Sequence, residues 1–208
     1  MEEKEELINY WLKSGTVTDR GLIDAFKTIP REKFIHNHQL EEAYGDYPLP
    51  IGFEQTISQP TTVMIMIQAM ELKKTDKVLE VGAGSGWCAA IMSKLCKEVI
   101  TTEIISGLVD FSSNNIKKTG IKNVKVVNLD GSRGYEKEAP YDKIMVTAAC
   151  PRIPQPLIDQ LKEGGIIIAP VGSLFGQSMI KARKIKGKLH TQNLGGFIFV
   201  PLKGEYGY

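Results

Sequence analysis

One stretch of the sequence indicates how the chain folds: Glu80-Val81-Gly82-Ala83-Gly84-Ser85-Gly86-Trp87. It follows the apolar run Lys77-Val78-Leu79 and leads into Ala89-Ala90-Ile91-Met92, a pattern that predicts a strand, a tight glycine turn and a helix. Glycine lets the backbone turn sharply and approach a ligand where a Cβ would collide. The first turn of the helix also leaves backbone N–H groups free, which suits the polar end of a nucleotide-like molecule. We therefore expect a ligand-binding loop here.

The spacing of these glycines separates two kinds of loop. A dinucleotide-binding fingerprint is Gly-x-Gly-x-x-Gly, with the third glycine five residues after the first. Here Trp87 lies five residues after Gly82, and the glycines at 82, 84 and 86 form Gly-x-Gly-x-Gly. With Glu80 two places before it, this form resembles the S-adenosylmethionine loop of class I methyltransferases. A tight strand-to-helix turn without a ligand is the alternative interpretation.

Strands and helices alternate from this stretch onward. In order, the pattern predicts strand 77–81, helix 86–96, strand 98–102, helix 106–119, strand 124–128, strand 142–147, helix 154–162 and strand 165–171. Near-continuous apolar strands such as Ile166-Ile167-Ile168 are typical of a parallel sheet covered on both faces. Residues 179–185 alternate around polar side chains, Lys186-Gly187-Lys188 predicts a turn, and 197–200 reads as a strand, which favours a closing antiparallel hairpin. The expected fold is α/β, with a doubly wound, mostly parallel seven-stranded sheet.

The part of the chain before residue 77 has a different character. Residues 5–14 and 19–28 carry apolar side chains at helical spacing, and Pro60 suits the first position of a third helix that runs to about Leu72. Between them, residues 44–60 contain three prolines and two glycines, which predicts a long loop. Long ordered loops are often functional, so this one is a candidate for part of an active site.

Length and composition favour one domain. A chain of 208 residues is long enough for one sizeable core and short for two. We expect a single domain over 1–208, made of an N-terminal helical and loop region (1–75), a cofactor-binding core (76–172) and a C-terminal hairpin (173–208).

Charge and targeting features exclude several classes of partner. Twenty-six basic and 24 acidic residues leave a net charge of +2, too weak to argue for nucleic-acid binding. The acidic start of the chain lacks the order of a signal peptide, and no apolar run reaches membrane-spanning length, so we expect a cytoplasmic protein without a membrane partner. No metal site is expected, because His36-x-His38 is the only close histidine pair and Cys-x-x-Cys is absent.

Acidic residues follow two of the predicted strands. In an open α/β sheet, ligands bind beyond the carboxyl ends of the strands. Glu103 lies there, 21 residues after Gly82, and its carboxylate can accept hydrogen bonds from both hydroxyls of a ribose. Asp130-Gly131 follows the third strand and can accept an amine such as that of adenine, although Asp-Gly is also a common turn. A solvated carboxylate is the alternative for Glu103, and the small residues Thr147-Ala148-Ala149 leave room beside these groups.

With these residues in place, the sequence resembles the protein-L-isoaspartate O-methyltransferases. The resemblance covers most of the chain, and its most specific part is Gln55-Thr56-Ile57-Ser58-Gln59-Pro60. The other matching segments are 48–52, 79–86, 102–104, 130–131, 141–149, 153–154, 161–165, 170–172 and 199–202. Two positions depart from the family pattern: Leu129 stands where glycine is usual, and Trp87 where tyrosine is usual.

The resemblance implies an activity and a set of sites. Such enzymes transfer a methyl group from S-adenosylmethionine to the α-carboxylate of L-isoaspartyl residues in damaged peptides and proteins, leaving S-adenosylhomocysteine and an ester that collapses to a succinimide. Ser58 would be the active-site residue. The cofactor would be bound by Glu80, Gly82, Ala83, Gly84, Gly86, Glu103, Ile104, Asp130 and Gly131. The substrate would be held by Thr56, Ile57, Val200, Pro201 and Leu202, and the enzyme would act as a monomer.

Elementary chemistry constrains the role of Ser58. A carboxylate with a pKa of about 4 is already ionised at neutral pH, so it needs no general base to attack a sulfonium methyl group. What remains is alignment, and a neutral hydroxyl can fix one carboxylate oxygen without quenching the other. We therefore expect Ser58 to orient the substrate and not to form a covalent intermediate, with the amides of Thr61 and Thr62 available to share in receiving the carboxylate.

Three other functions stay open from the residues alone. A nicotinamide-dependent oxidoreductase is disfavoured by the glycine spacing. A small-molecule or RNA methyltransferase would share the cofactor site and differ in residues 44–60, although Thr147-Ala148-Ala149-Cys150-Pro151 is unlike an amino-group methylation motif. A non-enzymatic module for damaged peptides would leave the glycine loop unexplained.

Overall fold

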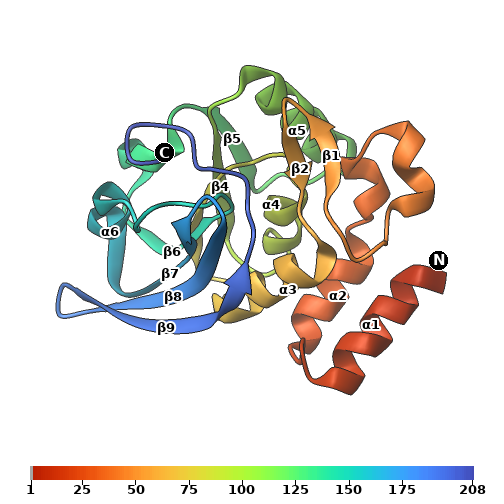
Figure 1. The fold of residues 1–208 in the computed structure, drawn as a ribbon, viewed down its shortest axis with the longest axis horizontal. Coiled ribbons are helices and arrows are strands. Elements are labelled where there is room, and N and C mark those ends of the chain that lie inside the picture. Colours follow the sequence, from red (N-terminus) through yellow and green to blue (C-terminus); the bar gives the residue numbers. More distant parts are fainter. Residues whose placement is uncertain (1) are drawn as a thin grey trace.

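A seven-stranded sheet forms the centre of the computed structural model, which describes residues 2–208 (Figure 1). Its strand order is β5-β4-β3-β6-β7-β8-β9. The first five strands in this order are parallel, and β8 and β9 continue the sheet as an antiparallel hairpin. The strands are β3 (Lys77–Val81), β4 (Glu98–Glu103), β5 (Val124–Asn128), β6 (Tyr141–Val146), β7 (Leu161–Ser173), β8 (Gly176–Ile185) and β9 (Lys188–Phe197). The predicted fold class is confirmed, and strand order reverses between β3 and β6.

Helices lie on both faces of this sheet. They are α1 (Glu2–Ser14), α2 (Arg20–Thr28), α3 (Pro60–Ala69), α4 (Trp87–Met92), α5 (Ser106–Lys118) and α6 (Gln155–Gln160), with short 3₁₀ helices η1 (Arg31–Phe34), η2 (Asn37–Glu42), η3 (Gly131–Arg133) and η4 (Glu136–Glu138). In the part of the chain that the structure describes, no helix is long and apolar enough to cross a membrane.

Side chains that alternate along the strands pack into two separate hydrophobic cores, one on each face of the sheet. Ile166 and Ile168 pack with apolar side chains of α1 to α5, whereas Ile167 between them packs on the other face with Leu157 of α6. All three isoleucines are fully buried. A strand buried on both faces has no polar side to present, which is why this segment reads as an unbroken apolar run.

The N-terminal helices are joined to the rest of the fold through Trp11. Its indole is fully buried, meets the ring of Phe26 edge to face at 4.8 Å, and donates a hydrogen bond from Nε1 to Thr61 Oγ1 at 2.7 Å. Asp19 caps α2: its Oδ1 accepts a hydrogen bond from the amide of Leu22 at 3.0 Å. Aspartate is one of the residues preferred at this position before a helix. These contacts fix α1 and α2 against α3.

Residues 44–60 contain a β-hairpin where the sequence predicts a loop. Strands β1 (Leu49–Gly52) and β2 (Gln55–Ile57) pair antiparallel, and the hairpin stands beside α5 (Figure 1). At its tip Gly52, Phe53 and Glu54 all have positive φ, of 87°, 54° and 59°. The sequence does not predict this hairpin, because its prolines are unusual in strands and neither strand is long enough to show an alternation of apolar and polar residues.

The predicted strand over 197–200 is wrong beyond Phe197. At that point β9 ends, and the chain turns to run beside the segment that follows β6. The amide of Ala149 donates to Val200 O at 2.8 Å, and the amide of Leu202 donates to Ala149 O at 2.7 Å. The apolar run Phe197-Ile198-Phe199-Val200 therefore begins in the sheet, where Phe197 pairs with β8, and ends beside Ala149. Its composition alone does not predict this change of partner.

Three predicted helices are shorter than expected. The helix expected from Pro60 to about Leu72 ends at Ala69, with Met70 as its C-cap. The helix expected over 86–96 ends at Met92, where hydrogen bonds of the i to i+3 kind close the turn, as in the amide of Lys94 donating to Ile91 O. The helix expected over 154–162 ends at Gln160, because Leu161 already pairs with Tyr141 in the sheet.

Candidate active site

A cleft lies at the carboxyl ends of the parallel strands. It has about 860 Å³ of free space, counting the part that opens to solvent. Its walls come from the β1–β2 hairpin, the ends of β3 and β4, the segments after β5 and β6, and the C-terminal segment. The predicted site residues that line it are Thr56, Ile57, Ser58, Gly82, Ala83, Gly84, Glu103, Ile104, Gly131, Val200, Pro201 and Leu202. The structure thus brings together residues that lie more than a hundred positions apart in the chain.

Three predicted site residues lie behind the lining. Glu80 is fully buried within the sheet. Gly86 forms the N-cap of α4 with φ of 86° and has Ile116 and Ser112 of α5 directly against it. Asp130 accepts the amide of Ser132 at 2.9 Å, at the start of η3. None of the three contributes to the surface of the cleft.

The glycine loop is shaped by protein contacts as much as by space for a ligand. The amides of Gly82 and Ala83 both donate to Thr102 O, at 2.9 and 3.0 Å. Gly82 has φ of 100°, and a Cβ there would collide with Oγ1 of Thr147. That hydroxyl donates to the carbonyls of Val81 and Gly82, at 2.9 and 2.7 Å. Glycine at 82 therefore allows β6 to close against the loop.

Glu103 presents a fixed carboxylate at the end of β4. Its oxygens accept the amide of Gly84 and the amide of Ile105, each at 3.0 Å, and the residue is only 7% exposed. A carboxylate offers about four lone-pair sites, so two amides leave acceptor capacity toward the cleft that Glu103 lines. An anchored acceptor of this kind fits a ribose with two neighbouring hydroxyls.

Apolar side chains complete this end of the cleft. Ile104, Ile105 and Leu108 lie beside Glu103, at the start of α5. Phe53 at the hairpin tip rests against Gly107, where a Cβ would collide with its ring. A carboxylate acceptor next to apolar walls suits a nucleoside, whose sugar is polar and whose base has apolar faces.

Arg31 supports the site from behind, and the sequence did not reveal it. Its guanidinium is fully buried and donates to four backbone carbonyls: Ala43 at 2.8 Å, Gly45 at 3.4 Å, Tyr47 at 3.2 Å and Ser58 at 3.0 Å. One buried side chain therefore holds both ends of the segment that carries the β1–β2 hairpin. Its only distinguishing feature in the sequence is that it follows Pro30, and an exposed arginine at this position would have the same local sequence.

Burial of this cation has a measurable electrostatic cost. Desolvation lowers the pKa of Arg31 to about 10, opposed by the nearby charge of Asp46. The guanidinium also lies over the ring of Trp87, 5.3 Å from its centroid, in a cation–π arrangement. Since Trp87 lines the cleft, Arg31 connects the wall beside the glycine loop with the backbone of Ser58.

The amide of Thr61 does not face the cleft as a free donor. It donates to Asp46 Oδ1 at 2.9 Å, while the Thr61 hydroxyl donates to Asp46 Oδ2 at 2.7 Å. The expected sharing of a substrate carboxylate by this amide is therefore wrong, because a side chain of the chain itself already caps α3.

Glu80 lies in an apolar setting beneath the loop. Both of its carboxylate oxygens are buried, and neither has a hydrogen-bond partner among the residues that the structure describes. Desolvation raises the pKa of Glu80 to about 7, opposed by Thr101 and Cys88 and reinforced by the charge of Glu103. Glu80 thus takes up a proton more readily than an exposed glutamate does.

Comparison with known proteins identifies the family. The family model described as "Protein-L-isoaspartate(D-aspartate) O-methyltransferase" matches residues 2–207. The chain belongs to this family. Among its relatives, the protein-L-isoaspartate O-methyltransferase of Methanoculleus marisnigri is 43% identical, over 99% of this chain and 94% of the relative. The enzyme of the same name from Dictyoglomus turgidum is 45% identical, over 95% of this chain and 90% of the relative.

Solved structures agree with this family. A Plasmodium falciparum protein assigned as a protein-L-isoaspartate O-methyltransferase, crystallised in complex with S-adenosyl-L-homocysteine, superposes with a TM-score of 0.82 at 26% identity, covering 95% of this chain and 97% of that one. Another protein-L-isoaspartate O-methyltransferase gives a TM-score of 0.88 at 30% identity, covering 98% of this chain and 67% of that one. The resemblance read from the motifs is confirmed, and S-adenosylmethionine is the cofactor of this methyltransferase.

We predict that Glu80→Gln changes how stability depends on pH. The folded-state pKa of Glu80, about 7, lies above its ordinary value of 4.5. Its stabilising contribution is therefore complete below pH 4.5 and is lost as pH rises through 7. Glutamine stays neutral, so the variant should be more stable than the parent at pH 8, by about 1–3 kcal/mol, and equally stable near pH 4.5.

Urea unfolding at several pH values measures this difference. Glu136→Gln is the matched control, because Glu136 is exposed and should show no such divergence. An unfolding free energy that falls equally in Glu80→Gln and the parent between pH 5 and pH 8 would contradict the prediction.

We also predict that Arg31→Lys loosens the hairpin segment. A single ammonium cannot reach four carbonyls in the fork geometry of a guanidinium, so buried acceptors lose their partners. The free energy of unfolding should fall by about 2–4 kcal/mol, and amide exchange over residues 45–58 should accelerate. Arg152→Lys, at an exposed arginine, should change stability by less than about 0.5 kcal/mol. If amide exchange over residues 45–58 is unchanged in Arg31→Lys, Arg31 does not hold the hairpin segment in place.

Proposed function

We propose that the chain methylates the α-carboxylate of L-isoaspartyl residues in damaged peptides and proteins, with Ser58 orienting that carboxylate. The resulting ester would collapse to a succinimide and so begin repair. One observation carries the residue assignment: Ser58 lines the same cleft as Gly84 and Glu103, although it lies far from both in sequence. Family membership supports the reaction, and this juxtaposition supports the roles of the residues.

The cofactor part of the proposal rests on the fit of the lining. Glu103 would accept the ribose hydroxyls, Ile104 and its apolar neighbours would cover the base, and Gly82, Ala83 and Gly84 would follow the methionine portion. When bound, S-adenosylmethionine supplies an electrophilic methyl group on a sulfonium. Glu80 and Gly86 would act from behind the lining, and Asp130 through the adjoining Gly131, which does face the cleft.

Ser58 is suited to orienting a carboxylate for three reasons. Its backbone carbonyl is fixed by Arg31, so its position in the cleft is set by a buried contact. No histidine among the described residues lines the cleft, so the usual histidine base of a nucleophilic serine is missing from it. The substrate carboxylate is already ionised at neutral pH and needs only alignment with the methyl group.

The substrate part of the proposal concerns the two backbone segments beside Ser58. Thr56 and Ile57 of β2 and Val200, Pro201 and Leu202 of the C-terminal segment all line the cleft. Backbone N–H and C=O groups of both segments would form hydrogen bonds with an extended peptide, as neighbouring strands of a sheet do. A monomer that acts in the cytoplasm, without nucleic acid, stays a prediction from the sequence.

A methyl-transfer assay with paired synthetic peptides tests the function. The two peptides share one sequence and differ only in aspartate or isoaspartate at one position. We expect labelling of the isoaspartyl peptide alone, because only the isoaspartyl residue has a free α-carboxylate, attached directly to Cα. In the aspartyl peptide that carboxyl group forms the backbone amide, and the free carboxylate lies one carbon further out on the side chain. Equal labelling of both peptides, or labelling of neither, would overturn the proposed specificity. Calorimetry that shows binding of NAD and not of S-adenosylmethionine would favour an oxidoreductase.

Ser58→Ala tests the role of the hydroxyl. Loss of an orienting hydrogen bond should lower kcat by about tenfold to a thousandfold, because alignment supplies part of the barrier. Cofactor affinity, measured by calorimetry, should stay within about twofold of the parent, since the cofactor is expected to bind Glu103 and the glycine loop and not the Ser58 hydroxyl. A large loss of cofactor binding in this variant would assign Ser58 to the cofactor site instead.

A further inference from the structure

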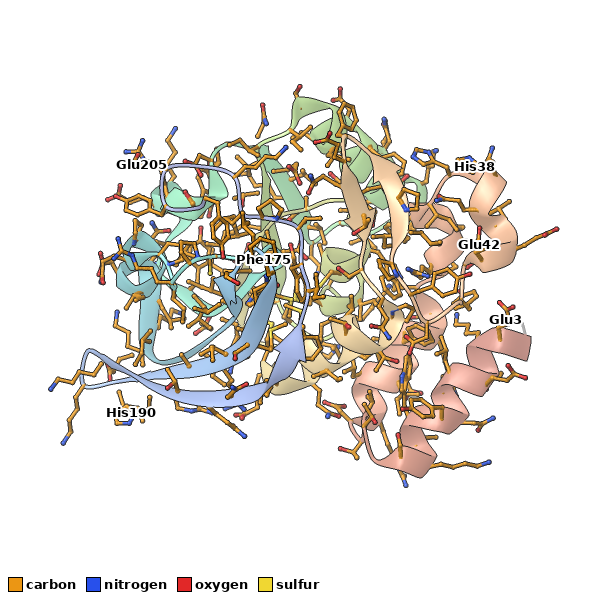
Figure 2. The ribbon with its side chains drawn as sticks, in the orientation of Figure 1. Glu3, His38, Glu42, Phe175, His190 and Glu205 are labelled. Carbon is orange, nitrogen blue, oxygen red and sulfur yellow. The ribbon has the colours of Figure 1, made fainter. Side chains whose placement is uncertain are left out.

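Three large apolar side chains are exposed near the C-terminal wall of the cleft. Leu174 and Phe175 lie in the turn between β7 and β8 and are 53% and 94% exposed. Ile198, which follows β9, is 81% exposed. We call these three residues the apolar platform. Figure 2 marks Phe175, next to the C-terminal segment that follows β9.

The fold places the apolar platform at the edge of the sheet where the cleft opens. Ile168 of β7 pairs with Met145, next to the end of β6, yet β7 continues to Ser173. Its turn therefore projects beyond the carboxyl ends of the parallel strands. Cys150 bridges Val171 there, and the neighbouring Ala149 bridges the C-terminal segment, so both exposed segments flank the chain that follows β6.

A buried glutamine fastens the two segments together. Gln177 is 4% exposed, donates from Nε2 to Ser173 O at 2.5 Å and accepts the amide of Phe199 on Oε1 at 2.8 Å. The amide of Phe175 in turn donates to Ser173 Oγ at 3.2 Å. The turn and the segment after β9 are therefore held at a fixed separation, and the exposed side chains belong to an ordered surface.

The apolar platform continues the wall of the substrate cleft. Val200 and Pro201 line the cleft, and Ile198 lies two residues before Val200. A substrate that extends from Val200 along the C-terminal segment toward β9 would pass beside Ile198.

We propose that Leu174, Phe175 and Ile198 bind an apolar side chain of the substrate polypeptide, a few residues from its isoaspartate. The proposal rests on the proposed function, because only a polypeptide substrate has neighbouring residues that must leave the cleft. The apolar platform carries no charge, so it selects apolar over polar neighbours by burying their surface. Apolar side chains are buried in folded proteins, so this surface favours unfolded and damaged chains.

Matched peptides test this surface. Two twelve-residue peptides contain one isoaspartate and differ only in two positions on each side, which are leucine and phenylalanine in one peptide and serine and glutamine in the other. For the parent, KM of the apolar peptide should be lower by about fivefold to twentyfold, the effect of removing one apolar side chain from water. In the double variant Phe175→Ser and Ile198→Ser, this preference should fall to about twofold or less.

Other readouts separate binding from general damage. The kcat at saturating peptide and the affinity for S-adenosylmethionine should stay unchanged, because the substituted side chains are exposed and lie outside the cofactor walls. Ile185→Ser is the control: Ile185 is 41% exposed at the other end of β8, and its substitution should leave the preference intact.

Each remaining outcome overturns a defined statement. If the parent methylates both peptides with equal KM values, the apolar platform alone is overturned. The same holds if the double variant keeps the parent's full preference for the apolar peptide. No methylation of either isoaspartyl peptide would overturn the proposed function and, with it, this surface. A parent that dimerises in sedimentation experiments, with a monomeric double variant, would assign the three side chains to a second copy of the chain instead.

Discussion

The pairing of β3 between β4 and β6 is the constraint on which the site depends. Because these strands are parallel, their carboxyl ends meet at one edge, and each delivers one group: the glycine loop, Glu103 and Thr147. Backbone hydrogen bonds continue past the strands, since the amide of Gly82 donates to Thr102 O and that of Thr147 to Val81 O. The loop is therefore tied on both sides before any ligand arrives. Preorganisation of this kind reduces the ordering that binding would otherwise require.

A buried cation does for the substrate wall what strand pairing does for the cofactor wall. Among the described residues, no carboxylate is a hydrogen-bond partner of Arg31; four carbonyls and the face of Trp87 replace the water that burial removes. Such a group is costly to leave unpaired, so the segment that supplies the carbonyls is held in one arrangement. The segment includes a hairpin with three consecutive positive φ values, which few chains would adopt unaided.

The C-terminal segment forms the third wall and depends on side chains from distant strands. Gln177 of β8 fixes the amide of Phe199, and Asp130 after β5 accepts the amide of Glu205 at 2.9 Å. The same Asp130 that precedes a cleft-lining glycine thus also anchors the end of the chain. The cofactor wall and the C-terminal wall are in this way joined through one carboxylate, and the proposed apolar platform extends the C-terminal wall.

The sequence by itself determined the family, the parallel sheet and a set of site residues most of which line the cleft. Local patterns sufficed there, because Ile166-Ile167-Ile168 must be buried on both faces, and a Gly-x-Gly-x-Gly turn with an acidic residue after the next strand fits few ligands. Only the tertiary structure decided the hairpin in residues 44–60, the departure of the chain from the sheet after Phe197, and the use of the Thr61 amide by Asp46. Each of these depends on a partner far away in the chain. Arg31 shows the reason most clearly: an arginine looks the same in any sequence, and only the fold brings carbonyls from 43 to 58 around it and closes it off from water.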